Sequence, residues 1–177
     1  MNPPSIRVAV VMERQAAPNR WEDWRHAVLE VVPDEAAFGN GVRCLHDDGT
    51  RSRWLHPGFV VELRADECKG YYLNLTSGRP SWFVSWRPVE GDPSQVEVSA
   101  VSVSYIEADR RLTADEQVQS VALEPDLCEW LRGYTQEHFV PEERRKVRAM
   151  SFLSPLERER QASAAAGLGV GEGPDGR

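Results

Sequence analysis

The chain has 177 residues, 41% of them hydrophobic and 28% charged, which is the composition of a folded globular domain rather than of a disordered or fibrous chain. No apolar run approaches the roughly 18 residues needed to cross a bilayer, and the N-terminus lacks the basic segment of a secretory signal, so we expect a cytoplasmic protein. Residues 1–140 carry 14 basic and 22 acidic residues, a formal net charge of −8 within a total of −7. That charge disfavours nucleic acid and anionic membranes as partners.

The first third of the chain is predicted to form strands. Ile6–Met12 is short and β-branched, which favours a buried strand. Trp21–Val32 fits either a strand or a short helix, and its valine-rich end favours the strand. Val42–His46 and Arg51–His56 flank the turn sequence Asp47-Asp48-Gly49, so we expect a hairpin there.

The centre of the chain predicts a second hairpin and a further strand. In Tyr71–Leu75 the residues alternate between two sides, and Ser81–Arg87 alternates in the same way around its tryptophans. The turn residues Ser77-Gly78 would join these two segments as antiparallel strands. Gln95–Val103 alternates apolar and polar residues, which is typical of a strand with one wet face.

The last part of the domain is predicted to hold its main helix. Thr113–Glu116 has the spacing of a capping box without a following apolar stripe, which predicts one helical turn. Gln119–Leu123 is expected to form a last short strand. Pro125 suits the first position of a helix extending to about Phe139. Its apolar stripe has helical spacing and should pack on the β core; it consists of Leu127, Trp130, Leu131 and Tyr134.

These elements predict a mainly β domain over residues 1–140. The architecture is an antiparallel β-barrel or sandwich of about six to eight strands, with one C-terminal α-helix packed on it. A mixed-charge basic extension is expected over residues 141–160, and a disordered tail rich in alanine and glycine over 161–177.

The sequence shows few signatures of catalysis or metal binding. It contains no CxxC or HExxH motif, no Gly-rich phosphate loop and no GxSxG elbow. A metal set is conceivable around the first hairpin, because Cys44 and His46 at i and i+2 of a strand share a face and His56 is near, but ordinary hairpin residues are the better interpretation. We therefore predict no metal, no cofactor and no enzymatic activity.

Six tryptophans are many for a chain of this length. Most are expected to fill a small β core, because each contributes a large buried area. Some could instead form an exposed platform for a partner. Trp54 and Trp82 are predicted to be the more exposed pair.

Three stretches in a fixed order resemble a known family. They are Val8–Arg14 with Asn19-Arg20-Trp21 and Trp24; Tyr72–Leu75 with Pro80, Phe83-Val84 and Trp86-Arg87; and Val101–Ser104 with Glu107-Ala108, the Trp130 helix and the basic Arg144–Arg148. In this order and spacing, over about residues 5–148, they resemble domain-of-unknown-function family 3305. The family has no established activity, and the resemblance supplies no catalytic residues.

The resemblance implies a role in binding a partner protein rather than a catalytic activity. Members of this bacterial family are often encoded beside molybdenum-dependent formate dehydrogenase components and their maturation factors, which implies an accessory, chaperone-like or regulatory role. Several polar and aromatic residues within the match are not needed for packing and form a candidate partner surface: Glu13, Arg14, Arg20, Trp21, Asn74, Trp82 and Arg87. The alternative is that the polar ones make structural hydrogen bonds and salt bridges.

Three functions remain open at this point. The first is a non-enzymatic protein-binding accessory or maturation factor for formate dehydrogenase. The second is a sensor or carrier that holds a small molecule or metallocofactor in an open barrel end. The third is an unrecognised enzyme, which would need a concave pocket with convergent titratable groups.

Overall fold

The computed structural model describes residues 3–17, 19, 21 and 23–141, and the predictions for 141–160 and 161–177 lie almost entirely outside them. The described strands are β1 (Ser5–Ala16), β2 (Trp24–Pro33), β3 (Arg43–Asp47), β4 (Arg51–Glu62), β5 (Ser81–Val89), β6 (Asp92–Ser102) and β7 (Gln117–Ala122). The α-helices are α1 (Cys68–Leu75), α2 (Tyr105–Thr113) and α3 (Pro125–His138), with single 3-10 turns at Ala36–Phe38 and Ala65–Glu67. The prediction of a mainly β fold is confirmed. None of these helices has both the length and the hydropathy that crossing a membrane requires.

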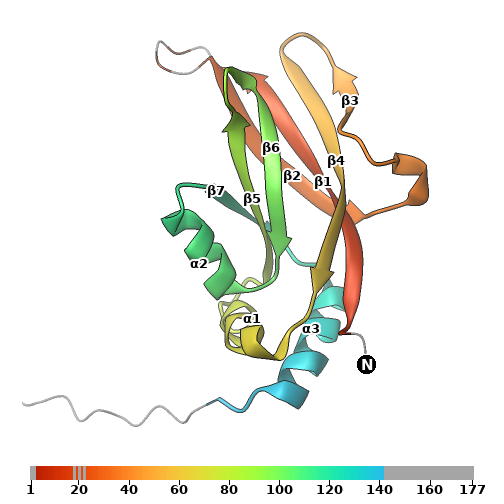
Figure 1. Ribbon diagram of the computed structural model, residues 1–177, viewed down its shortest axis with the longest axis vertical. Coiled ribbons are helices and arrows are strands. Elements are labelled where there is room, and N and C mark those ends of the chain that lie inside the picture. The colour runs from red at the N-terminus through yellow and green to blue at the C-terminus, as the bar shows by residue number, and fades with distance from the viewer. Residues whose placement is uncertain (1–2, 18, 20, 22, 142–177) are drawn as a thin grey trace, which may run out of the picture. The chain divides into compact units, whose positions relative to one another are not determined.

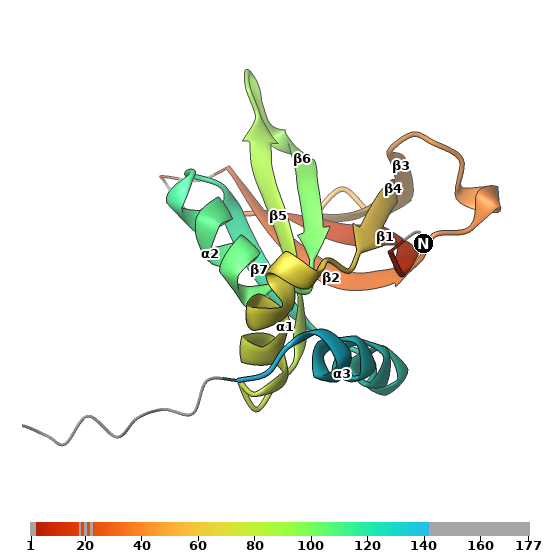
Figure 2. The ribbon, with the colours of Figure 1, turned by 60° about the horizontal axis from the view of Figure 1, so that its bottom comes forward.

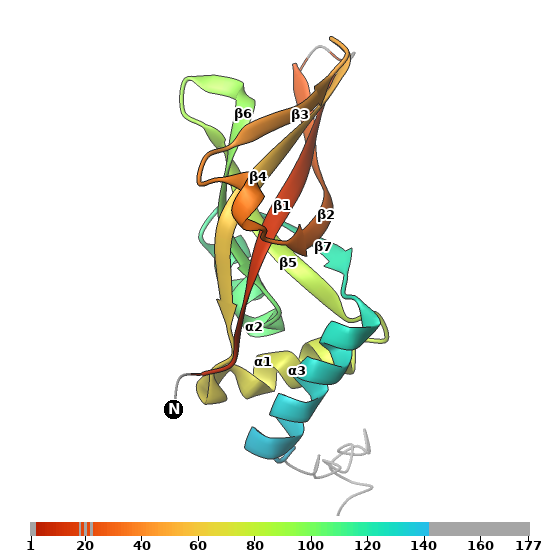
Figure 3. The same cartoon turned by 90° about the vertical axis from the view of Figure 1, so that its right-hand side faces the viewer.

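The strands form two antiparallel sheets (Figures 1 and 3). One has the order β2-β1-β4-β3 and the other β6-β5-β7. The two sheets contact each other through β2 beside β7 and β4 beside β6, but they do not close into a barrel. Of the two predicted architectures, the sandwich is therefore the one observed.

The segment Val8–Met12 of β1 is apolar because both of its faces are covered. Val8, Val10 and Met12 point into the main core between the sheets. Ala9 and Val11 point to the other side, where they pack in a second cluster with Leu55, Val32 and Phe38. A strand buried on both faces reads as a continuous apolar run, and this confirms the strand predicted at Ile6–Met12.

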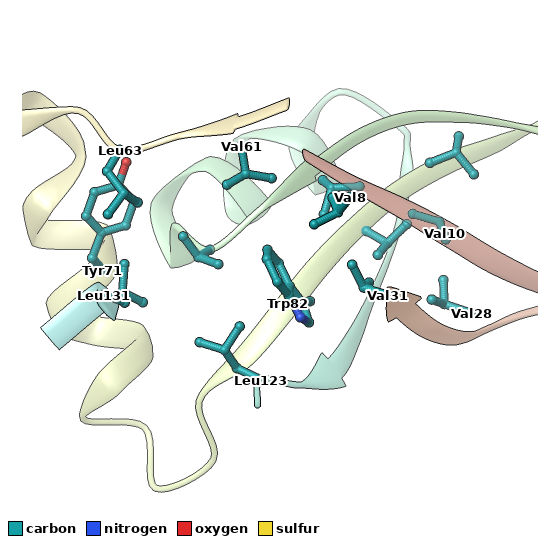
Figure 4. Packing of buried hydrophobic residues seen from close by; sticks show 14 of the residues in the cluster. Val8, Val10, Val28, Val31, Val61, Leu63, Tyr71, Trp82, Leu123 and Leu131 are labelled. Carbon is teal, nitrogen blue, oxygen red and sulfur yellow. The ribbon is translucent and has the colours of Figure 1, made fainter. Parts of the chain in front are cut away.

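Trp82 lies at the centre of the main core (Figure 4), among side chains from β1, β2 and the segment after β7. It is 1% exposed, and its Nε1–H donates to Glu124 Oε2 at 2.9 Å. The prediction that Trp82 is exposed is wrong. β5 is the central strand of its sheet, and the face that holds Trp82 and Val84 is turned to the opposite sheet.

Helices α1 and α3 close one end of the sandwich (Figures 1 and 2). Tyr71 of α1 and Leu131 of α3 are buried there against Leu63, and Tyr71 meets Tyr134 edge to face. Pro125 opens α3 as predicted, and the Leu127–Tyr134 stripe packs on the core. The predicted C-terminal helix is confirmed.

The hairpin predicted over Tyr71–Arg87 is wrong in its first half. Residues Tyr71–Leu75 belong to helix α1, and β5 pairs with β6 and β7 instead. The buried positions of α1 include Cys68, Tyr71 and Asn74, which have helical spacing. The polar Asn74 on this inner face hid the helical pattern, so the alternation of Tyr71, Leu73 and Leu75 suggested a strand.

Helix α2 was not predicted. The expected helical turn at Thr113–Glu116 falls where α2 ends rather than where a helix begins. The true start is at Ser104, whose hydroxyl oxygen accepts a hydrogen bond from the Glu107 backbone N–H at 3.2 Å. Ser104 and Glu107 have the capping-box spacing, so the signal was present directly after the predicted strand Gln95–Val103.

Candidate functional site

The residues of the predicted partner surface do not lie on one surface. Glu13 and Arg14 are near the end of β1 that is remote from helices α1 and α3, and Trp21 is in the β1–β2 loop beside them. Asn74 and Trp82 are buried in the interior, and Arg20 lies outside the described residues.

Asn74 is held by three hydrogen bonds to backbone. Its Nδ2 donates to the carbonyl oxygens of Ser81 (2.8 Å) and Val103 (2.9 Å), and its Oδ1 accepts from the Ser81 N–H (2.9 Å). The side chain is 1% exposed. Asn74 therefore joins α1 to the start of β5 and the end of β6, which is the structural role that the sequence left open.

Glu13 and Arg87 make cross-strand ion pairs. Glu13 Oε2 lies 3.5 Å from Arg53 Nε on the neighbouring strand β4. Arg87 pairs with Glu97 across β5 and β6, where the carboxylate raises the pKa of the exposed guanidinium. The Arg87–Glu97 pair is exposed on both sides, and such a pair contributes little to stability, whereas the Glu13 side chain is only 17% exposed.

The inward face of β1 changes from apolar to charged toward the end opposite α1 and α3. After Val8, Val10 and Met12, the next inward position is Arg14, which pairs in register with His26 of β2. The guanidinium carbon of Arg14 lies 4.5 Å from the centre of the Trp24 ring and 5.8 Å from that of Trp54. The apolar core thus ends in a cation packed against two indole rings.

The polar contacts of Arg14 are incomplete among the described residues. Nη1 donates to the Ser94 carbonyl oxygen at 3.4 Å, and Nη2 lies 3.6 Å from Asp47 Oδ2. Its Nε is buried and has no hydrogen-bond partner in the described part of the chain. An unpaired buried donor costs stability, so this position favours an added acceptor.

Next to Arg14 is a cleft of about 540 Å³, which we call the open-end cleft. Its lining comes from the β1–β2 loop, the start of β2, and the hairpin and edge of the second sheet: Trp21, Asp23, Trp24, Arg25, His26, Trp86, Pro88, Pro93 and Gln117. The Trp21 side chain is 90% exposed.

His26 links two walls of the open-end cleft by contacting Pro93 and Trp86. Its Nε2 is hydrogen-bonded to the Pro93 carbonyl oxygen at 3.0 Å, and its ring meets Trp86 edge to face with centroids 5.7 Å apart. Trp86 Nε1 is buried and, within the described segments, has no hydrogen-bond partner. Trp24, His26 and Trp86 were not in the predicted surface. Trp24 and His26 lie two positions apart at the start of β2, so they share a face next to a loop, and this spacing could have indicated them.

Burial shifts the pKa of several titratable groups away from neutral pH. Burial raises the pKa of the Cys68 and Cys128 thiols, and it raises the pKa of Tyr71 to about 12. Burial also lowers the pKa of His56 to about 4, so its imidazole is neutral at pH 7. Protonated thiols are poor nucleophiles and poor metal ligands.

Cys44, His46 and His56 do not come together. A bulge between Cys44 and His46 places Cys44 opposite Trp54 and His46 opposite Arg53, which are on different faces of β4. Both are exposed, whereas His56 is buried on the inner face. In the described ranges, no three His, Cys, Asp or Glu residues cluster with the geometry of a metal site.

The structure thus defines the protein as an antiparallel two-sheet β sandwich, closed at one end by helices and carrying an aromatic cleft at the other. Its sequence matches the family described as "Protein of unknown function (DUF3305)" over residues 7–148, and the chain belongs to that family. This confirms the family resemblance found in the sequence. Comparison with curated proteins and with solved structures gives no match.

Proposed function

We propose that the protein is a non-enzymatic binding module and that its open-end cleft docks an extended segment of a partner protein. The observation that carries this proposal is Trp21, which is 90% exposed at the rim of a cleft of about 540 Å³ lined by further aromatic rings. Tryptophan and arginine are the residues most enriched among those that dominate protein–protein binding energy.

The composition of the cleft favours a particular kind of segment. Trp21, Trp24 and Trp86 supply flat apolar walls, and Pro88 and Pro93 supply rigid ones. Aromatic-lined grooves of this kind receive extended, proline-containing segments, which lose little conformational entropy on binding. We therefore propose an extended partner segment with a proline or aliphatic anchor between the indoles.

The partner we propose is a molybdenum-dependent bacterial formate dehydrogenase or one of its maturation factors, met in the cytoplasm. This part of the proposal depends on the gene neighbourhood that the family resemblance implies, and the cleft itself is compatible with it. The raised pKa of the Cys68 and Cys128 thiols disfavours these two residues as nucleophiles, which supports a binding role.

The decisive experiment measures binding of the full chain to purified formate dehydrogenase and to its purified maturation factors by biolayer interferometry. Trp21→Ala should weaken binding at least tenfold, because hot-spot aromatics cost roughly 2 kcal/mol or more when truncated. Val140→Ala is the matched control, since Val140 is 87% exposed and lies after α3, away from the cleft.

Two results would contradict the proposal. If neither formate dehydrogenase nor a maturation factor binds the unmodified chain, the partner assignment is wrong. If one of them binds and Trp21→Ala binds equally well, the assignment of the open-end cleft is wrong. Circular dichroism of both variants checks that the sandwich is intact.

A second candidate function is a small-molecule carrier at the same end. The buried Arg14 Nε, without a partner in the described residues, favours it, because this donor suits a carboxylate or phosphate. Native mass spectrometry of protein purified from its own cells distinguishes the two functions. A stoichiometric anionic ligand that is lost in Arg14→Met would support the carrier.

A further inference from the structure

A second cleft opens where β1 and β2 meet the start of α3. It has a volume of about 560 Å³, and we call it the acidic cleft. Apolar side chains form most of its wall: Ile6, Val8, Val31, Val32, Trp82 and Leu127. The core tryptophan Trp82 thus has one side in the packed interior (Figure 4) and contributes to this cleft as well.

The charged groups around the acidic cleft are unbalanced. Asp34, Glu124 and Asp126 line it together with a single cation, Arg7. Glu124 is already fixed by the hydrogen bond from Trp82 Nε1, and Arg7 is 63% exposed while pairing with Asp34 Oδ2 at 3.2 Å. Three carboxylates facing one solvent-exposed guanidinium leave a negative potential over an apolar cavity.

Asp34 is the carboxylate in this cleft that is best placed to bind a cation. Its side chain is only 6% exposed, and its backbone N–H donates to the Arg7 carbonyl oxygen at 3.0 Å, which fixes its position. Oδ1 is buried and has no hydrogen-bond partner in the described part of the molecule. A buried carboxylate oxygen without a donor is costly, so the site is completed by a ligand that brings one.

From these observations we infer that the acidic cleft binds a small organic cation with an apolar body, such as an alkylammonium compound. The ammonium group donates to the Asp34 carboxylate, and the chain lies against Ile6, Val32 and Leu127, the apolar wall residues that are only partly buried. The Trp82 indole N–H reports occupancy through Glu124, which lines the cleft and accepts its hydrogen bond. This pattern of an apolar pocket with few placed polar groups is typical of small-molecule sites. It is independent of the partner proposed for the open-end cleft.

The test uses hexylammonium chloride as the probe and the assigned indole N–H resonance of Trp82 in the ¹⁵N-labelled full chain. We expect a saturable shift of this resonance, and at least tenfold weaker binding for 1-hexanol, which has the same chain without the charge. Asp34→Asn should weaken hexylammonium binding at least tenfold. Asp66→Asn is the matched control, because it removes the same charge from an exposed carboxylate that pairs with Arg64.

A second variant keeps the test independent of the folding of Asp34→Asn. Leu127→Lys places an ammonium group in the cleft from the first turns of α3, and it should abolish hexylammonium binding. Equal binding of hexanol and hexylammonium would refute the cation requirement, and an unshifted Trp82 resonance would refute the site. Tighter binding of Nα-acetyl-lysine amide than of hexylammonium would overturn the small-amine assignment in favour of a protein side chain.

Discussion

Substituting Gly70 tests how closely α1 and α2 are packed. Gly70 is buried within α1, where alanine would ordinarily stabilise a helix by about 1 kcal/mol. Here a Cβ would fall far inside contact distance of Ser104 Oγ, 3.1 Å from Ser104 Cβ and 3.3 Å from the Ile106 backbone nitrogen. Ser104 is 0% exposed, so a shift of its side chain would disturb packed neighbours. We therefore expect Gly70→Ala to destabilise the protein.

The magnitude follows from what Ser104 would lose by moving. Its hydroxyl caps α2 through the Glu107 N–H and donates to Glu67 Oε2 at 2.7 Å. Loss of a cap costs about 1 kcal/mol, and loss of a hydrogen bond to a charged group costs about 1.5–3 kcal/mol. After the gain in helix propensity, the net loss is about 1.5–3 kcal/mol. If Ser104 stays and the helices separate, overpacking costs about the same.

The assay is urea denaturation followed by circular dichroism, with Gly70→Ala, Ser104→Gly and the double variant compared in a cycle. Ser104→Gly removes the hydroxyl and the Cβ that the new methyl group would meet. In that background Gly70→Ala should be neutral or stabilising. Additive effects of the two substitutions, or a Gly70→Ala variant as stable as the parent, would refute the reasoning.

Three further predictions concern buried polar groups. Burial lowers the pKa of His56 to about 4 in the folded protein, from an unfolded value near 6.5, so protonation favours unfolding. The free energy of unfolding should therefore fall as the pH drops from about 6.5 to 4, by at most about 3 kcal/mol. His56→Gln should flatten this pH dependence, measured by urea titration at stepped pH. Asn74→Ala should lower the free energy of unfolding by about 3 kcal/mol or more in the same assay, because it leaves buried backbone groups of Ser81 and Val103 unpaired. A loss under about 1 kcal/mol would contradict the structural role of Asn74. Arg14→Lys should cost about 1 kcal/mol, since lysine cannot stack flat on Trp24; an unchanged urea midpoint would show that the stacking contributes nothing.

The sequence predicted the elements whose pattern depends on local chemistry. Ile6–Met12, the hairpin through Asp48, and the helix from Pro125 are all present, because alternation, turn residues and an N-terminal proline are local signals. Helix α1 could not be predicted in this way. Its inner face includes Asn74, and the need for an amide there arises only from the carbonyl groups that β5 and β6 bring to it.

The candidate sites were harder to predict than the fold. Arg14 and Trp21 were proposed from the sequence, and they do lie at the open end. Trp82 was predicted to be exposed, but it is buried in the core. A cleft depends on which strands meet at its walls. His26 faces Trp86 only because β2 packs opposite the β5–β6 hairpin, and no local signal encodes this distance of 60 positions in the sequence.

Some buried polar groups have hydrogen-bond partners and therefore hold the fold together, whereas others have none in the described residues. Around α1 and the start of α2, Asn74 is bonded to backbone carbonyl groups, and Ser104 is bonded to Glu67. The buried side-chain atoms without partners in the described residues are Arg14 Nε, Trp86 Nε1 and Asp34 Oδ1. The first two belong to the open end and the third to the acidic cleft. Because an unpaired buried polar atom costs stability, these three atoms support the binding proposals made for the two regions.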